Sequence, residues 1–135
     1  MEGKLFHKSA WINIRDKKIL VVRSKGNSIF FLPGGNIEKE ETGEQALIRE
    51  IREELSVEII KSTIVNIGTF EAPSYEFPKT ASIRMDCYLA NYKCALKPSS
   101  EIEEIAWFRY GDKNKISNVD AKVFEYLKEK KYLLS

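Results

Sequence analysis

GNIEKEETGEQALIREIREELSV, residues 35–57, is the stretch that decides the fold of this chain. Thr42 and Gln45 have the spacing of a capping box, in which each side chain bonds the other residue's backbone amide. The pattern predicts a helix over residues 43–55, because aliphatic residues recur at i, i+4 and i+8 and form one apolar stripe. The stripe consists of Leu47, Ile51 and Leu55.

The same helix carries three carboxylates on one side. Glu50, Glu53 and Glu54 stand at i, i+3 and i+4, within an arc of roughly 100°. Like charges at this spacing destabilise a helix, and Arg49 and Arg52 offset part of the repulsion. One interpretation is a solvated charged face. The other is a cluster of hard oxygen ligands for a divalent cation, and Mg²⁺ or Mn²⁺ suits such ligands.

Outside this stretch the sequence alternates strand patterns with turns. We expect strands over residues 6–14, 19–22, 29–32, 57–60, 64–70, 82–92 and 105–108, and a C-terminal helix over 119–131. Residues 71–78 are expected to form a loop. Many strands with only two or three helices predict an α+β fold, an α/β/α sandwich with a central mixed sheet between helices.

Composition narrows the class of protein. The chain has 135 residues, 43% of them hydrophobic and 31% charged, which fits one globular domain over residues 1–135 and excludes a disordered chain. Its net charge of +2 gives no support for nucleic acid as a partner. No apolar run approaches the ~20 residues of a membrane span, and the N-terminus lacks a signal-peptide pattern, so we expect a cytoplasmic protein. The two cysteines, Cys87 and Cys94, are expected to be reduced.

The 35–57 stretch resembles the Nudix box, G-x5-E-x7-R-E-U-x-E-E-x-G-U, where U is a bulky aliphatic residue. Eight of the nine defined positions match, and the exception is Ser56 in place of the final glycine. The preceding Leu32-Pro33-Gly34-Gly35 and Ala46 inside the helix are also typical of this family.

The resemblance implies a hydrolase that cleaves the diphosphate linkage of a nucleoside diphosphate joined to another group. It implies a Mg²⁺ site, with Mn²⁺ as the alternative, held by Glu50, Glu53, Glu54 and the carbonyl of Gly34. Arg49 resembles the family arginine that orients these glutamates by ion pairing. A bound cation would withdraw charge from the phosphate oxygens and orient the attacking water.

Three further positions follow from the resemblance. Glu41 resembles the glutamate that braces the loop against the helix. Ser56 takes the place of a glycine expected in the left-handed conformation, where another residue costs on the order of 1 kcal/mol. Related enzymes place an acidic residue in the loop before the last strand, and Glu101 is our choice, with Glu103 and Glu104 as rivals. The general base stays open between Glu50 and this loop, and the loop's other interpretation is solvent exposure.

Substrate-binding residues are predicted outside the box. Tyr75 could stack on a base, and Asn118 and Asp120 could bind a purine edge through hydrogen bonds. Either of the last two could instead cap the C-terminal helix. Arg23 is a candidate for contact with phosphates or an ordinary surface residue.

The short chain is most similar to the MutT-type enzymes, which hydrolyse nucleoside triphosphates, including oxidised ones, to a monophosphate and pyrophosphate. ADP-ribose, a dinucleoside polyphosphate, a nucleotide sugar or an RNA 5′ end are alternative substrates. A catalytically silent nucleotide-binding module is the alternative of another class, and such a module is expected to lose box carboxylates that this chain keeps. The partner is expected to be a small nucleotide, and the protein a monomer or a homodimer.

Overall fold

The computed structural model describes residues 5–73, 81–133 and 135. The strands are β1 (Leu5–Trp11), β2 (Ile14–Arg15), β3 (Lys18–Ser24), β4 (Gly34–Asn36), β5 (Glu58–Ile59), β6 (Val65–Pro73), β7 (Ser82–Leu89), β8 (Tyr92–Lys93) and β9 (Ile102–Phe108). The helices are α1 (Gly43–Leu55) and α2 (Asn118–Glu129), with short 3₁₀ helices η1 (Lys61–Thr63) and η2 (Tyr110–Lys115).

The larger sheet is mixed, as the sequence predicts. Its strand order is β4-β1-β7-β6, and β1 and β7 are parallel while the other two pairs are antiparallel. A second, antiparallel sheet has the order β2-β3-β9, and β5 pairs with β8. The short strand β4 therefore lies at one edge of the mixed sheet, directly before the loop that leads into α1.

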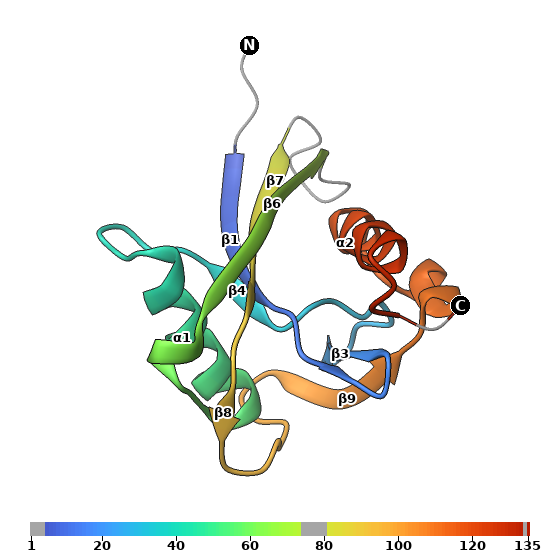
Figure 1. The fold of residues 1–135 in the computed structure, drawn as a ribbon. Helices are drawn as coiled ribbons and strands as arrows, with labels where there is room; N and C mark the ends of the chain where they lie inside the picture. Colours follow the sequence, from blue (N-terminus) through green and yellow to red (C-terminus); the bar gives the residue numbers. More distant parts are fainter. Residues whose placement is uncertain (1–4, 74–80, 134) are drawn as a thin grey trace.

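Two apolar layers separate the strands from the two helices. Along β3, Ile19 and Val21 pack in the layer that contains the buried side of α2, whereas Leu20 and Val22 pack in the layer of α1. A strand buried on both faces needs such an uninterrupted aliphatic run. Figure 1 shows α1 and α2 on opposite sides of the strands, so the predicted α+β sandwich is confirmed.

Several predicted boundaries are wrong. Residues 29–32 form no regular strand, because Phe30 and Phe31 make only isolated bridges, to Ile116 and Val22. The strand of this region is β4, two residues later. Strand β6 continues to Pro73, through residues predicted as loop, because β7 pairs with it as far as Ser82. The single strand predicted over residues 6–14 is divided between β1 and β2, and the one over 82–92 between β7 and β8, with the two parts of each in different sheets. The remaining differences are shifts of one to three residues at the ends of elements.

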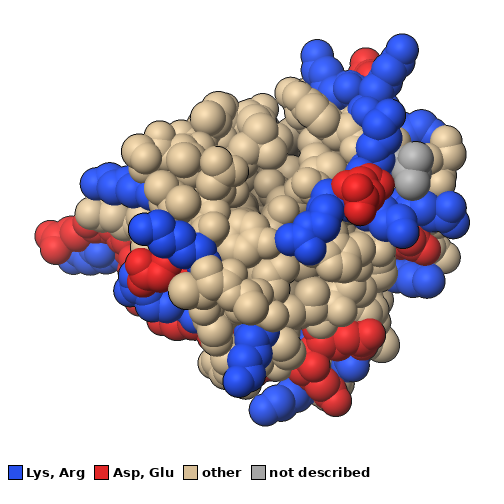
Figure 2. Space-filling model, turned by 60° about the horizontal axis from the view of Figure 1, so that its bottom comes forward, with Lys and Arg blue, Asp and Glu red and all other residues tan. Residues whose placement is uncertain are grey.

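Figure 2 shows the face at the bottom of Figure 1. Lys and Arg side chains are interspersed with Asp and Glu side chains around an uncharged centre on this face. No helix among the described residues is long and apolar enough to cross a membrane. Cys87 is buried and Cys94 is exposed, and both are free thiols.

Candidate active site

The ends of α1 are fixed by local contacts. The Thr42 hydroxyl accepts a hydrogen bond from the backbone N–H of Gln45 at 3.1 Å, and the backbone N–H of Thr42 donates to Oε1 of Gln45 at 2.9 Å. This is the predicted capping box. At the other end Ser56 has φ 61°, the left-handed conformation expected there. Both ends of the helix are therefore fixed, and so are the positions of the carboxylates that it carries.

The three carboxylates of α1 differ in burial. The Glu53 side chain is 54% exposed and that of Glu50 is 19% exposed, whereas Glu54 as a residue is only 4% exposed. Oε1 of Glu54 accepts a hydrogen bond of 2.9 Å from the backbone N–H of Gly34. The cluster is therefore not a uniformly solvated face, because one member points into the protein.

Two glycines allow β4 to approach its neighbours closely. Gly34 has φ +142°, and a Cβ there would lie 2.0 Å from the backbone oxygen of Ser9. A Cβ on Gly35 would lie 2.4 Å from the carboxyl carbon of Glu50. The loop backbone is thus in contact with both Glu54 and Glu50, and side chains at these two positions would prevent that contact.

Burial and like charge raise the pKa of two of these carboxyls. Burial raises the pKa of Glu54 to about 8, and the charges of Glu50, Glu101 and Glu53 add to it, while the Gly34 N–H opposes it. Burial also raises the pKa of Glu50, against the lowering effect of Arg49. A group that is both buried and surrounded by like charges is typical of functional sites.

Arg49 links the loop to the helix. Its Nε and Nη2 donate to the two carboxylate oxygens of Glu41 at 2.8 and 2.9 Å, and its Nη1 donates to Glu50 at 2.7 Å. Nη1 also lies 3.7 Å from Oε1 of Glu53. The hydrogen bonds from Arg49 lower the pKa of Glu41 to about 2. Glu41 therefore anchors Arg49, and Arg49 in turn contacts Glu50 and Glu53 on α1.

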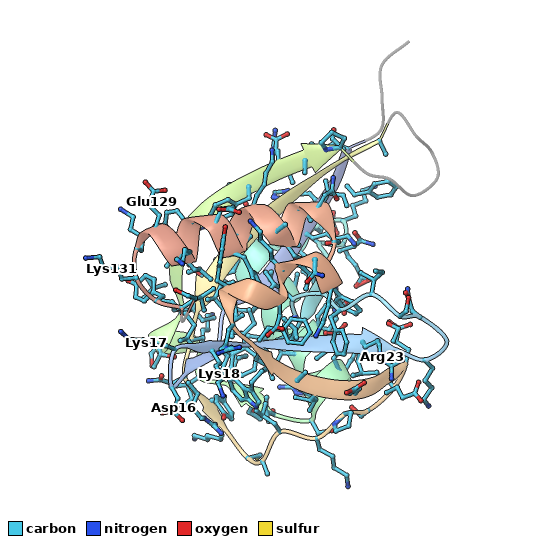
Figure 3. The ribbon with its side chains drawn as sticks, turned by 90° about the vertical axis from the view of Figure 1, so that its right-hand side faces the viewer. Asp16, Lys17, Lys18, Arg23, Glu129 and Lys131 are labelled. Atoms are coloured by element: carbon cyan, nitrogen blue, oxygen red, sulfur yellow. The ribbon has the colours of Figure 1, made fainter. Side chains whose placement is uncertain are left out.

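The structure separates the three acidic candidates before β9. Glu101 is near enough to the α1 cluster for its charge to raise the pKa values of Glu50 and Glu54. Glu103 and Glu104 instead pair with Arg23, at 3.4 and 3.0 Å. Figure 3 shows Arg23 at the end of β3 beside β9. The charge of Glu101 thus acts on the α1 cluster, whereas Glu103, Glu104 and Arg23 are occupied by ion pairs with one another.

The carboxylates of α1 are candidate ligands for a metal ion. Among the described residues, no group of three or more His, Cys, Asp or Glu side chains converges closely enough to form a metal site by itself. The carboxylates of Glu50, Glu53 and Glu54 nevertheless offer only oxygen donors, and burial disfavours the charged form of Glu54. Oxygen donors of this kind fit Mg²⁺ or Mn²⁺ by their chemistry.

A cavity of about 610 Å³ extends from this loop to the start of α2. Gly34 and Gly35 line it together with Asn118 and Asp120. Asp120 is 1% exposed, and its Oδ2 accepts a 2.6 Å hydrogen bond from the Ser117 hydroxyl. Its Oδ1 is buried and has no hydrogen-bond partner in the structure described. A buried acceptor without a partner is costly in a protein interior and points to a ligand.

Burial raises the pKa of Asp120 to about 6, and the Ser117 hydroxyl, the charge of Lys8 and the Leu32 backbone oppose this change. Asp120 is therefore largely ionised at neutral pH and can only accept hydrogen bonds. Neither Asn118 nor Asp120 is the N-cap of α2, since that residue is Ser117. The alternative that one of them caps the helix is wrong.

The other predicted substrate-binding residues differ in their relation to this cavity. Asn118 lines it, and its side-chain N–H donates to the backbone oxygen of Pro73 at 2.5 Å. Arg23 is not among the described residues that line it. Tyr75 lies outside the described residues, so its role stays a prediction. The sequence analysis missed Lys8 and Ile29, which line the cavity but stand in segments with no distinctive motif.

Comparison with known proteins places these features in one family. The sequence pattern of the NUDIX domain matches residues 5–127, nearly the whole chain. The chain belongs to the Nudix family.

Individual Nudix relatives are more distant. The chain is 32% identical over 97 residues to an ADP-ribose pyrophosphatase from Methanocaldococcus jannaschii, covering 70% of this chain and 56% of the relative. It is 35% identical over 72 residues to an 8-oxo-dGTP diphosphatase from Escherichia coli, covering 43% of this chain and 52% of the relative. The chain therefore spans about half the length of the curated relatives that it matches.

The fold agrees over a larger part of the chain. A MutT protein from Methanosarcina mazei superposes with a TM-score of 0.78 at 18% identity, covering 97% of this chain and 98% of the other. At this identity the likeness shows the fold alone. The Nudix fold of this chain is therefore established together with the family, and the substrate is a separate question.

Proposed function

We propose that this protein hydrolyses the diphosphate linkage of a nucleoside diphosphate derivative with the help of a divalent cation. The observation that carries the proposal is the shared cavity. One part of its lining, Gly34 and Gly35, contacts the carboxylates of Glu54 and Glu50, and another part holds Asp120, whose Oδ1 has no hydrogen-bond partner among the described residues. A molecule with phosphates and a hydrogen-bonding base has two such ends.

Each acidic residue has a proposed role at the phosphate end. Glu50, Glu53, Glu54 and the carbonyl of Gly34 would hold Mg²⁺ or Mn²⁺, which when bound neutralises phosphate charge. Arg49 keeps the Glu50 carboxylate in place through the 2.7 Å hydrogen bond. Proton abstraction from water falls to Glu50 or Glu101, and the charges of both raise the pKa of the buried Glu54 carboxyl.

A nucleoside triphosphate is the proposed substrate, with a monophosphate and pyrophosphate as products. Two observations support it. One curated relative is named 8-oxo-dGTP diphosphatase. The ionised Asp120 accepts hydrogen bonds, as the N–H groups on a purine edge require. A binding module without catalysis is disfavoured, because Glu50, Glu53 and Glu54 are all present.

ADP-ribose is the second candidate. The relative with the longest of these alignments, over 97 residues, is named ADP-ribose pyrophosphatase. ADP-ribose also carries a diphosphate between two groups, so the same carboxylates would serve. The two substrates differ in their products, since only a triphosphate releases pyrophosphate.

The test is a panel of substrates with Mg²⁺ and, separately, Mn²⁺. The panel contains nucleoside triphosphates, oxidised triphosphates, ADP-ribose, diadenosine polyphosphates and nucleotide sugars, with nucleoside monophosphate, phosphate and pyrophosphate measured separately. Pyrophosphate release from a triphosphate is expected. Turnover of ADP-ribose alone would move the substrate to the second candidate, and no turnover of any compound would contradict the proposal.

The proposed metal ligand Glu53 has a matched control of similar exposure, Glu58. Glu53→Gln should lower kcat by more than about tenfold without unfolding the protein, because its side chain is half exposed and lies off the apolar stripe. Glu58→Gln removes another exposed carboxylate, one that pairs with Arg52 away from the site, and should leave kcat unchanged. Equal rates for the two variants would contradict the metal role of Glu53.

A further inference from the structure

The residue that departs from the Nudix box forms contacts that a glycine cannot form. Ser56 occupies the left-handed position at the end of α1, with φ 61° and ψ 26°. Its hydroxyl donates to the Ser99 hydroxyl at 3.2 Å, and the Ser99 hydroxyl donates to the backbone oxygen of Glu53 at 2.5 Å. The two hydroxyls form a chain from the helix end to a loop 43 residues later in the sequence.

That loop is bound to the end of α1 by backbone contacts as well. The backbone N–H of Ser99 donates to the Glu54 oxygen at 2.9 Å, and that of Lys97 donates to the Leu55 oxygen at 3.0 Å. These bonds satisfy carbonyls that a helix end leaves without partners. The loop from residue 97 to 101 therefore takes its position from the last turn of α1, the turn that carries Glu53 and Glu54.

Glu101 follows Ser99 in a tight turn. The backbone N–H of Ile102 donates to the Ser99 oxygen at 3.0 Å, and Ser100 between them has φ 56°. On the other side, the Glu101 oxygen accepts from the N–H of Lys25 at 2.9 Å. The start of this turn is fixed at Ser99, so a shift of Ser99 would move Glu101 relative to the cluster on α1.

We propose that Ser56 is a positioning residue, whose hydroxyl holds Ser99 on the helix end and thereby sets Glu101 against Glu50 and Glu54. The inference rests on the proposed function, because Glu101 matters only if the cluster is catalytic. It explains the presence of serine at a position where the backbone favours glycine. The charge of Glu101 raises the pKa of Glu54, which is consistent with this position of the loop.

The structural alternative is that Ser56 serves only the stability of the helix end. Ser56→Gly separates the two, because it removes the hydroxyl and also relieves the left-handed backbone. A positioning role predicts that the variant is as stable as the wild type or more stable, and yet has a kcat about fivefold lower, the value of one hydrogen bond. KM should not change, because the substrate cavity is not lined by Ser56 or Ser99.

Lys131→Gly is the matched control. Lys131 also has a left-handed backbone, with φ 65°, and it lies beyond the end of α2 (Figure 3). This variant should gain stability with no change in kcat.

A double-mutant cycle with Glu101→Gln tests the route of the effect. If Ser56 acts through Glu101, Ser56→Gly should have no further effect on kcat in the Glu101→Gln background. Amide hydrogen exchange gives a second readout, since the amides of Lys97, Ser99 and Ile102 should exchange faster in Ser56→Gly.

A wild-type kcat in Ser56→Gly, independent effects in the cycle, or unchanged exchange in the loop would each overturn the proposal. Inactivity of the wild type on the whole substrate panel would overturn the proposed function and this inference with it. Activity of the wild type with an unaffected Ser56→Gly variant would overturn the inference alone.

Discussion

Replacing Glu54 with glutamine should stabilise the metal-free protein at alkaline pH. The Glu54 carboxyl is buried, and its pKa is raised to about 8 from an ordinary value of 4.5, chiefly by burial. At a pH above the pKa of Glu54 in the folded state, the folded protein must hold a buried negative charge that the unfolded chain exposes to water. Glutamine has nearly the same shape, still accepts from the Gly34 N–H and carries no charge.

The sign follows from proton linkage. The folded state binds the proton more tightly than the unfolded state, so the free energy of unfolding falls as pH rises from about 4.5 to about 8. A pKa difference of about 3.5, at 1.36 kcal/mol per pKa unit, gives about 5 kcal/mol as the upper bound of this cost. Below pH 4.5 the carboxyl is protonated in both states and the cost is absent.

The assay is thermal unfolding in EDTA at several pH values. The wild type and Glu54→Gln should have similar Tm values near pH 4.5, whereas at pH 9 the variant should melt about 10 °C higher. Added Mg²⁺ should raise the Tm of the wild type more than that of the variant, because a ligand that binds the folded state stabilises it. A Tm difference that does not depend on pH would refute the reasoning, as would a variant less stable at pH 9.

Two further predictions concern the loop and the cavity. Gly34→Ala should destabilise the fold by about 3 kcal/mol or more in denaturant unfolding, because its Cβ would clash with the backbone of Ser9. Gly35→Ala should lower kcat with a smaller loss of stability, because its Cβ displaces only the Glu50 side chain. Equal losses of stability would contradict this. In thermal melts, Asp120→Asn should stabilise the ligand-free protein above pH 6 by up to about 3 kcal/mol. In steady-state kinetics, it should raise KM at least about tenfold with little change in kcat. An unchanged KM would remove Asp120 from the substrate site.

The helix that carries the site could be predicted to the residue because its signals are local. The Thr42 cap, the apolar stripe and the left-handed end at Ser56 all lie within 15 residues. The aliphatic run of residues 19–22 was equally informative, since a strand buried on both faces consists almost wholly of apolar, mostly β-branched residues. Such features depend on neighbours in the sequence, and a single sequence contains them.

Features that depend on distant partners could not be predicted. Residues 29–32 have the composition of a strand, but the neighbouring segments offer Phe30 and Phe31 only single bridges. Pro73 continues β6 because β7 lies beside it, although the sequence there is typical of a loop. The choice of Glu101 over Glu103 likewise depends on Arg23, 80 residues away from Glu103. The sequence narrowed that choice to three residues, and the fold shows that two of them, Glu103 and Glu104, pair with Arg23.

The buried carboxylate of Asp120 lines the cavity, and that of Glu54 is bonded to the lining residue Gly34; both are better explained by chemistry than by folding. Glu54 and Asp120 both have pKa values raised by burial, so each makes the ligand-free fold less stable at neutral or alkaline pH. Packing alone would favour apolar or amide side chains at both positions. A divalent cation at Glu54 and the N–H groups of a base at Asp120 would each compensate one of these carboxylates. Binding of a nucleotide together with its metal should therefore stabilise the protein more than either ligand alone.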